Sequence, residues 1–194
     1  MFLPKKITGF LKKVFSTPID LLVGDVLNKK HGGMIILGSG KPGVGKTLTA
    51  EVYSEMQKMP LYSVSISELG VSAKELEGNL EVIFRRAEKW GAMLLFDEVD
   101  IFLAERDKED LNRTAIVGVF LRLMDYFKGV MFLTSNMSDI LDYAILSRVT
   151  LRIDYPDLTE KTRKDIWKDK LEHAGIQLVD GYDEITKINL NGRE

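Results

Sequence analysis

A glycine-rich stretch, "GSGKPGVGKTLTAE" at residues 38–51, constrains the fold more than any other part of the sequence. Glycine loses more backbone freedom on folding than other residues, so glycines tend to lie where a side chain would collide with something. The stretch directly follows the apolar run "MIIL" at 34–37, and its last residues begin the helical pattern "LTAEVYSEM". The sequence therefore predicts a buried strand, a tight loop and a helix in succession.

Short apolar strands alternate with helical patterns along the rest of the chain. Further strands are expected at 61–65, 93–96, 130–135 and 149–153. Two apolar stripes predict core-facing helix sides, one at Leu76, Leu80, Ile83, Phe84 and Ala87 and one at Ile116, Val119, Phe120, Leu123 and Phe127. Ser72 and Glu75 have the spacing of a capping box, and a last helical pattern over 159–174 stops at Gly175. This alternation is typical of an α/β fold of three layers, αβα, with a five-stranded parallel sheet.

The composition and charge of the 194-residue chain exclude several classes of protein. Its 27 lysines and arginines nearly balance 29 aspartates and glutamates, and the net charge of −2 offers no bulk attraction to nucleic acid. The sequence has no cysteine, hence no disulfide and no thiolate metal site, and His31 and His173 are far apart in sequence. No apolar run approaches the roughly 20 residues that cross a bilayer, and the N-terminus does not resemble a secretory signal. We therefore expect one globular, cytoplasmic unit.

The loop from Gly40 to Thr47 fits the pattern G-x-x-x-x-G-K-[ST], whose backbone N–H groups wrap the α- and β-phosphates of a nucleotide. In such a loop Lys46 would reach the β- and γ-phosphates, and the hydroxyl of Thr47 would hold Mg²⁺. An ordinary strand–loop–helix connection can match by accident, but the strand before the loop and the helix after it favour a phosphate site. The residues predicted to bind the phosphates of the nucleotide are Gly40, Lys41, Pro42, Gly43, Val44, Gly45, Lys46, Thr47 and Leu48.

Two acidic residues follow the expected strand at 93–96, in "MLLFDEVD". Asp97 would lie beside the loop, where it can hold the Mg²⁺ shell, and Glu98 can polarise the attacking water. Acidic residues also follow strands simply to cap the next helix, as Asp100 could do. The phosphate loop favours the catalytic interpretation, with Thr47 and Asp97 at the metal.

Two further polar residues stand close to the ends of expected strands. Asn136 ends "FLTSN" and, at the C-terminal edge of a parallel sheet, could orient water and the γ-phosphate; a turn-forming asparagine is the alternative. Arg148 lies in "LDYAILSRV", after a short helical segment and before the last strand. Its local sequence is equally consistent with an ordinary surface arginine.

Taken in this order, the four elements resemble those of the AAA+ ATPases, from about Asp25 to the end of the chain. "GKPGVGKTLTAE" is similar to the family's Walker A motif, "LLFDEVD" to Walker B, "LTSN" to sensor 1 and "LDYAILSRV" to the arginine-finger region, most of all in AAA-type domains of poorly characterised ATPases. The resemblance implies a P-loop NTPase that hydrolyses ATP with Mg²⁺ and works as a ring, commonly a hexamer. It also implies that Arg148 reaches the γ-phosphate in the neighbouring subunit.

Three features differ from the family's usual pattern. The family's loop usually has proline where Lys41 stands, and "LGVSAKE" at 69–75 lacks the aromatic pore residue of members that thread polypeptide. The family's C-terminal helical lid is longer than the tail of this sequence, so only part of a lid is expected. Arg193, in "NGRE", falls near the position of the second sensor, where it would contact the nucleotide.

The expected organisation is a nucleotide-binding domain at 18–156 and the start of the lid at 157–194, preceded by an amphipathic helix at 1–17. In this first segment an apolar side opposes four lysines, Lys5, Lys6, Lys12 and Lys13. A helix of this kind could lie on a membrane surface, but packing against the domain or a neighbouring subunit is favoured.

Two functions fit these observations. The first is a ring motor or remodeller that couples ATP hydrolysis at subunit interfaces to an unknown protein or nucleic-acid client. The second is a low-turnover, nucleotide-switched loader or scaffold, similar to clamp or helicase loaders. Glu98 favours the first, because a pure binding module needs no carboxylate to activate water.

Overall fold

The computed structural model describes residues 33–70, 72–100, 111–137 and 143–176. Its strands are β1 (Met34–Ser39), β2 (Leu61–Val64), β3 (Met93–Phe96), β4 (Val130–Ser135) and β5 (Leu151–Asp154). Its helices are α3 (Lys46–Met56), α4 (Ala73–Trp90), α6 (Leu111–Met124), α7 (Tyr143–Leu146) and α8 (Glu160–His173), with a 3₁₀ turn η1 (Ile66–Leu69). The helix expected at 1–17 lies outside the described residues, as does Arg193.

The five strands pair in parallel, in the order β2-β3-β4-β1-β5. The central strands β1, β3 and β4 are buried along their whole length, whereas the edge strands β2 and β5 are partly exposed. Continuous apolar strands of this kind belong to parallel sheets whose two faces are both covered. The predicted five-stranded parallel sheet is confirmed, and each strand begins and ends within two residues of its predicted bounds.

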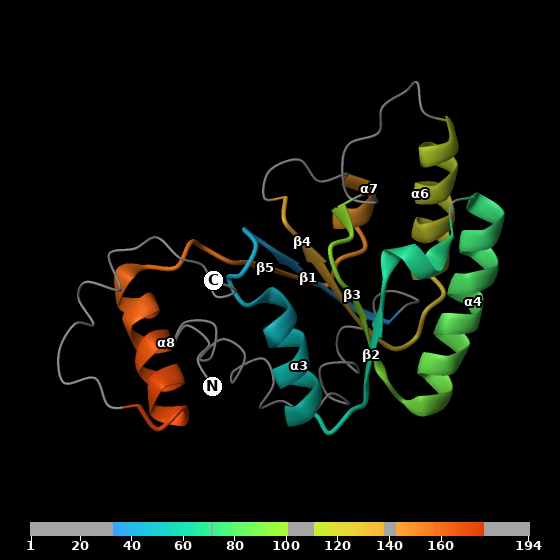
Figure 1. Ribbon diagram of the computed structural model, residues 1–194. Helices are drawn as coiled ribbons and strands as arrows, with labels where there is room; N and C mark the ends of the chain where they lie inside the picture. The colour runs from blue at the N-terminus through green and yellow to red at the C-terminus, as the bar shows by residue number, and fades with distance from the viewer. Residues whose placement is uncertain (1–32, 71, 101–110, 138–142, 177–194) are drawn as a thin grey trace.

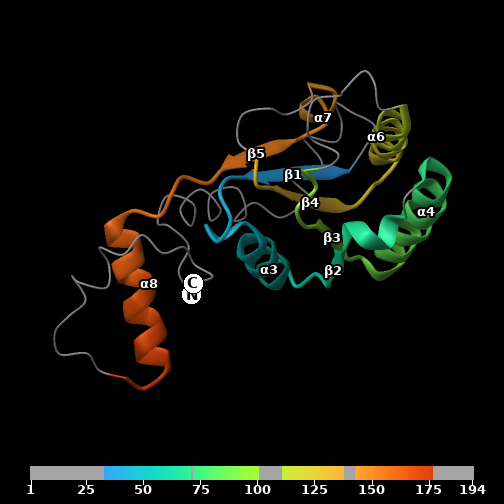
Figure 2. The same cartoon turned by 45° about the horizontal axis from the view of Figure 1, so that its top comes forward.

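Helices cover both faces of the sheet, which gives the predicted three layers (Figures 1 and 2). Alternate residues of a strand point to opposite faces. Leu37 and Phe96 therefore pack toward α4 and α6, whereas Ile36 and Phe132 pack toward α3. Each fully buried leucine, isoleucine or phenylalanine stabilises the fold by about 1.5–3 kcal/mol relative to its exposed state, so both cores contribute.

The two long helices on the first face follow the predicted apolar stripes. The stripe of α4 is buried throughout, at Leu76, Leu80, Ile83, Phe84 and Ala87. Ahead of α4 the predicted capping box is present, because the Ser72 side chain accepts from the Glu75 N–H at 3.3 Å and Glu75 Oε2 accepts from the Ser72 N–H at 3.2 Å. In the second stripe Phe120, Leu123 and Phe127 are buried, and α6 ends before the last of these residues.

Helix α8 confirms the last predicted helix but lies apart from the sheet in both views (Figures 1 and 2). Its N-cap is Thr159, whose hydroxyl accepts from the Thr162 N–H at 3.2 Å, and it ends at His173, two residues before Gly175, where φ is 72°. None of its residues is buried, so Ile166, Trp167 and Leu171 remain only partly covered.

Glycine-to-alanine changes at two positions should move stability in opposite directions. A Cβ at Gly78, inside α4, would meet nothing within 4 Å, so Gly78→Ala should stabilise the fold by roughly 0.5–1 kcal/mol through lower chain entropy. A Cβ at Gly33 would lie 2.2 Å from the Gly129 carbonyl oxygen, so Gly33→Ala should destabilise it. Urea denaturation of both variants measures the two effects. Equal stability of Gly33→Ala and wild type would contradict the close approach of the two backbones.

Candidate functional site

The loop and the polar residues predicted from the sequence meet at one edge of the sheet. Strands β3, β4 and β1 are neighbours and run in parallel, with Phe96 beside Leu133 and Ser39 beside Ser135. The carboxyl ends of these three strands therefore lie together, and ligands of open α/β sheets bind outside such ends. Each strand ends in one of the predicted motifs.

The loop after β1 depends on glycines at fixed positions. The φ angles are 151° at Gly40, 76° at Gly43 and 102° at Gly45, in a region that side chains rarely adopt. A Cβ on Gly40 would lie 2.5 Å from the carbonyl oxygen of Tyr155, a buried residue that follows β5. Gly45 is the N-cap of α3, and no side chain caps this helix end. A helix cannot bond its own first N–H groups, so this end suits an anion.

Lys46, the first residue of α3, places its ammonium group under the loop. Its side chain is buried, with 6% of the residue's surface exposed. Nζ donates to the carbonyl oxygens of Gly40 and Lys41, both at 2.7 Å, and to Oδ1 of Asn136 at 3.0 Å. A buried ammonium requires such polar partners. The contact joins the predicted loop lysine to the predicted residue at the end of β4.

The remaining loop residues are positioned by other contacts. The Lys41 side chain is exposed and forms an ion pair of 2.6 Å with Asp157, a type of contact that adds little stability. Pro42 is exposed, whereas Val44 is buried among the apolar residues beneath α3. Leu48 is half-buried in the first turn of α3.

Thr47 and Asp97 bring a hydroxyl and a carboxylate together beside the loop. Thr47 Oγ1 donates to Oδ1 of Asp97 at 3.0 Å. Oxygen donors of this kind suit Mg²⁺, which binds proteins through one or two such groups and keeps several water ligands. The pair therefore fits the predicted metal position, although within the described residues no three histidine, cysteine, aspartate or glutamate side chains gather around a metal site.

A buried threonine that the sequence analysis did not single out holds this corner together. Thr134 of β4 donates its hydroxyl hydrogen to Oδ1 of Asp97 and accepts from the Glu98 N–H at 2.9 Å. Its carbonyl oxygen also accepts from the Val99 N–H at 2.9 Å. In the sequence Thr134 reads only as a good strand former, and its position in "LTSN", two residues before Asn136, is the one signal that could have drawn attention to it.

Glu98 lies at a strained point of the backbone. Its φ of 56° is unusual for a residue other than glycine, and its side chain is exposed. Strained backbone tends to occur at functional sites when neighbouring contacts hold it in place. The hydrogen bond from Glu98 N–H to Thr134 provides one such contact.

Asp100 fastens the end of β4 to the end of β3. One of its oxygens, Oδ1, accepts from the Ser135 hydroxyl and from the Asn136 N–H at 3.0 Å. The sequence analysis weighed Asp100 only as a cap of the next helix, and the residues that follow it, 101–110, lie outside the described part of the chain. The structure adds that Asp100 positions Asn136, whose amide oxygen faces Lys46.

A second carboxylate joins β1 to β5 beneath the loop. The Ser39 hydroxyl donates to Asp154 at 2.6 Å, and Arg152 Nε donates to the same oxygen at 2.8 Å. Burial raises the pKa of Asp154, but the hydrogen bonds from Ser39 and Arg152 and the charge of Arg152 outweigh it, so the pKa lies below its usual range. The carboxylate is therefore ionised at neutral pH and fixes the strand end from which the loop starts.

Arg148 is not part of this cluster. It follows α7, and its guanidinium group contacts Asp125 and the Ala144 carbonyl oxygen of its own chain. The role predicted for Arg148 in a neighbouring subunit stays a prediction. Arg193, predicted to contact the nucleotide, lies outside the described residues.

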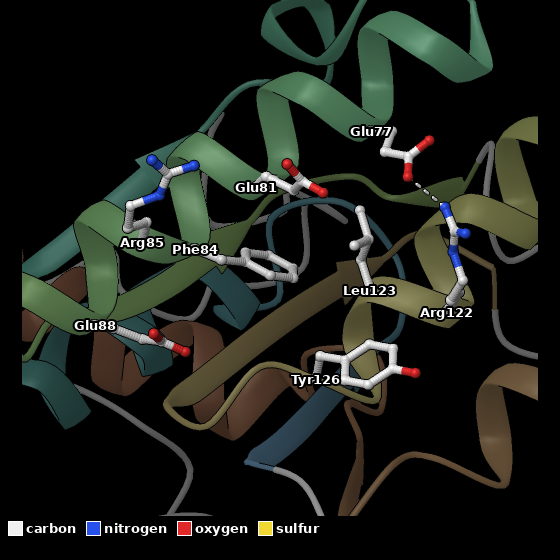
Figure 3. Close-up of a pocket in the computed structure, with 8 residues that line it drawn as sticks. All are labelled: Glu77, Glu81, Phe84, Arg85, Glu88, Arg122, Leu123 and Tyr126. Atoms are coloured by element: carbon white, nitrogen blue, oxygen red, sulfur yellow. Dashed lines mark hydrogen bonds and ion pairs between the residues drawn. The ribbon is translucent and has the colours of Figure 1, made fainter.

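A groove of about 510 Å³ lies between α4 and α6 (Figure 3). Phe84 and Leu123 line it together with charged residues, and it shares no residue with the loop. Glu77 and Arg122 of this groove form an exposed ion pair of 2.7 Å. Within the described residues, no helix combines the length and the apolar character that crossing a membrane requires.

Comparisons with known proteins agree on one family. The family described as "ATPase family associated with various cellular activities (AAA)" has a sequence model that matches residues 36–157, more than half of the chain. The chain is 32% identical over 161 residues to "Mitochondrial sorting homolog" of Caenorhabditis elegans, covering 78% of this chain and 47% of that protein. It is 28% identical over 181 residues to "ATPase family AAA domain-containing protein 3A homolog" of Drosophila melanogaster, covering 79% and 30%.

A third relative and a solved structure extend the comparison. The chain is 32% identical over 154 residues to "ATP-dependent zinc metalloprotease FtsH 1" of Alkaliphilus metalliredigens, covering 71% of this chain and 25% of that protein. It therefore spans between a quarter and a half of the length of these three relatives. A chain in the "Structure of E. coli MS115-1 HORMA:CdnC:Trip13 complex" has the same fold, with a TM-score of 0.65 and 19% identity over 95% of this chain and 67% of that chain.

Replacing Thr134 by valine should destabilise the fold without changing the volume of the buried side chain. Valine leaves the Glu98 N–H and one Asp97 oxygen without the hydroxyl that both contact. An unsatisfied buried polar group costs about 1–3 kcal/mol. The free energy of unfolding, measured in urea, should fall by about that amount. A Thr134→Val protein as stable as wild type would show that this hydroxyl is not needed to hold the corner.

Proposed function

Because the chain belongs to the ATPase family associated with various cellular activities, the AAA family, we propose that it binds ATP with Mg²⁺ at the loop of residues 40–48 and hydrolyses it. The hydrolysis takes place at the interface between subunits of a ring, and it drives the remodelling of a macromolecular client. The names of the relatives include ATPases and an ATP-dependent protease, and these activities are properties of those proteins. For this chain the proposal depends on its own residues.

One observation carries the proposal. The Lys46 ammonium, the Asn136 amide and the Thr47–Asp97 pair converge at the carboxyl ends of three adjacent parallel strands. A polyphosphate needs a cation, backbone N–H groups and a metal beside the same phosphates. The loop glycines and the open N-terminus of α3 add the backbone donors. No single one of these features is specific, but their convergence supports a nucleoside triphosphate as ligand.

The residues of the loop divide the binding between them. Lys46 exchanges its loop carbonyl partners for the β- and γ-phosphate oxygens, and the N–H groups of residues 43–48 surround the α- and β-phosphates. Thr47 and Asp97 hold the Mg²⁺ ion, directly or through its water ligands. Bound there, Mg²⁺ neutralises the charge that develops on the phosphate oxygens during transfer.

Two residues prepare the attacking water. Glu98 is exposed at the same edge and accepts a proton from the water, while Asn136 orients the water and the γ-phosphate. Thr134 fixes the backbone of Glu98, and Asp100 fixes that of Asn136. The two catalytic side chains are thus mounted on neighbouring strand ends that are tied to each other.

Arg148 completes the site of the neighbouring subunit in this proposal. It lies outside the cluster of its own chain, which is what a residue shared between two subunits requires. An arginine supplied to the γ-phosphate in this way can increase the rate roughly 10³-fold or more. The client is a protein or a nucleic acid.

Lys46→Ala should strongly weaken nucleotide binding in a folded protein. The ammonium is the cation nearest to the loop carbonyls, and charge-assisted hydrogen bonds contribute about 1.5–3 kcal/mol, so ATP affinity should fall about tenfold or more. Calorimetric titration with a non-hydrolysable ATP analogue measures it, and circular dichroism checks the fold. Lys89→Ala, an exposed lysine in the last turn of α4, is the matched control. Undiminished affinity of folded Lys46→Ala would refute the phosphate site.

Two inactive variants should recover activity when they are mixed. Glu98→Gln keeps Arg148 for its neighbour but lacks the base, whereas Arg148→Ala keeps its own base but offers no arginine. Each variant alone should still bind ATP but should release phosphate only at the background rate. A mixture can form complete sites between unlike subunits, so phosphate release should recover and rise with total protein concentration.

The mixed variants test Arg148, and the turnover of the wild type separates the two candidate functions. If the mixed variants assemble together and stay inactive, Arg148 is not the shared residue. If wild type binds ATP but never exceeds background turnover at any concentration, the low-turnover loader or scaffold replaces the motor as the function of this chain.

A further inference from the structure

Arg148 is held by a carboxylate of its own chain. Its Nε donates to Oδ1 of Asp125 at 2.9 Å, and its Nη2 donates to Oδ2 at 2.9 Å. Two parallel bonds of this kind fix the plane of the guanidinium group as well as its position. A third bond runs from Nη1 to the Ala144 carbonyl oxygen at 2.7 Å.

The contacts connect the ends of two helices that are distant in sequence. Asp125 directly follows α6, and Ala144 belongs to α7, after which Arg148 comes. Both helices lie on the same face of the sheet (Figure 1). The buried residues Met124 and Ile145, which neighbour Asp125 and Ala144, belong to one apolar core. The carboxylate therefore stands on a rigid base, although it follows the end of its helix.

The geometry leaves part of the guanidinium group available. A guanidinium group has five N–H donors, and these three bonds use one on Nε and one on each terminal nitrogen. Among the residues that the structure describes, one N–H on Nη1 and one on Nη2 remain for another acceptor. The Arg148 side chain is 27% exposed and the Asp125 side chain 49% exposed, so an anion on a second molecule can approach.

Holding the side chain in this way removes an entropic cost. A free arginine loses its rotamer freedom when it is fixed on a ligand, and a displacement of about 1 Å in a reacting geometry can lower a rate about 100-fold. An arginine that is already oriented avoids both penalties at the moment of transfer.

We propose that Asp125 is a positioning residue, which orients Arg148 for the γ-phosphate of ATP in the neighbouring subunit. The inference rests on the proposed function, because it assigns a partner to the arginine of the shared site. Asp125 itself touches neither the nucleotide nor the water, and it belongs to the chain that offers the arginine.

The chain contains a matched control for this carboxylate. Glu77 of α4 accepts from Arg122 of α6 at 2.7 Å, and its side chain is 42% exposed, close to the 49% of Asp125 (Figure 3). Arg122 stands three residues before Asp125, at the same end of α6. Glu77→Gln removes one carboxylate charge from this region and leaves the Arg148 contacts intact.

The test compares Asp125→Asn with Glu77→Gln in steady-state phosphate release. Asparagine has the size of aspartate but cannot accept both arginine bonds with a carboxylate. Asp125→Asn should lower kcat by about tenfold to 100-fold while KM and analogue affinity stay near wild type, because its own phosphate loop is intact. Glu77→Gln should remain within about twofold of wild type.

Mixing experiments distinguish positioning from a general structural role. Asp125→Asn should recover activity when mixed with Glu98→Gln, whose Arg148 and Asp125 are both intact. It should not recover when mixed with Arg148→Ala, because neither chain then offers an oriented arginine. A chain that is merely misfolded recovers with neither partner.

The results distinguish a failure of the positioning role of Asp125 from a failure of the proposed shared site. Turnover of Asp125→Asn within twofold of wild type, or above it, overturns the positioning role, as does a loss that Glu98→Gln cannot rescue. If Glu98→Gln also fails to rescue Arg148→Ala, the shared site itself is wrong and the role of Asp125 falls with it. If that rescue works and the Asp125→Asn rescue does not, only the positioning role is lost.

Discussion

The parallel pairing of β3, β4 and β1 is the constraint on which the rest of the structure depends. Because the three strands are neighbours and point the same way, their carboxyl ends deliver Asp97, Asn136 and the loop before Lys46 to one edge. Lys46, Asp97 and Asn136 follow one another in the sequence at intervals of about 40 to 50 residues, and only the order of the strands makes them neighbours. An antiparallel partner at any of these positions would move one motif to the opposite end of the sheet.

Buried polar contacts then give this edge a defined geometry. The Thr134 hydroxyl donates to Asp97 and accepts from the Glu98 N–H. The Lys46 ammonium donates to two carbonyl oxygens and to the amide oxygen of Asn136. In a low-dielectric interior such networks are stable only when most of their members are satisfied. A change at one member therefore affects the others, and the loop and the two strand ends behave as one unit rather than as separate motifs.

The sequence predicted those parts of the site whose chemistry is tied to spacing. The glycines, Lys46 and Thr47 form a continuous motif, and the apolar runs predicted the strands that end at Asp97 and Asn136. The structural roles of Thr134 and Asp100 were not predicted, because their contacts depend on β3 lying beside β4. The local periodicity of a sequence does not determine the order of the strands in a sheet. The partner of Arg148, Asp125, stands 23 positions earlier in the chain, so no local pattern could have indicated it.

Helix α8 differs from the other long helices in one physical respect, since none of its residues is buried. Its free energy of opening is therefore set by its own caps and turns and not by the sheet core. Its amide hydrogens can exchange with solvent through local unfolding, whereas those of β1 and β4 exchange only through global unfolding. Local opening of α8 therefore leaves the packing that holds the loop intact, because that packing lies between the sheet and α3.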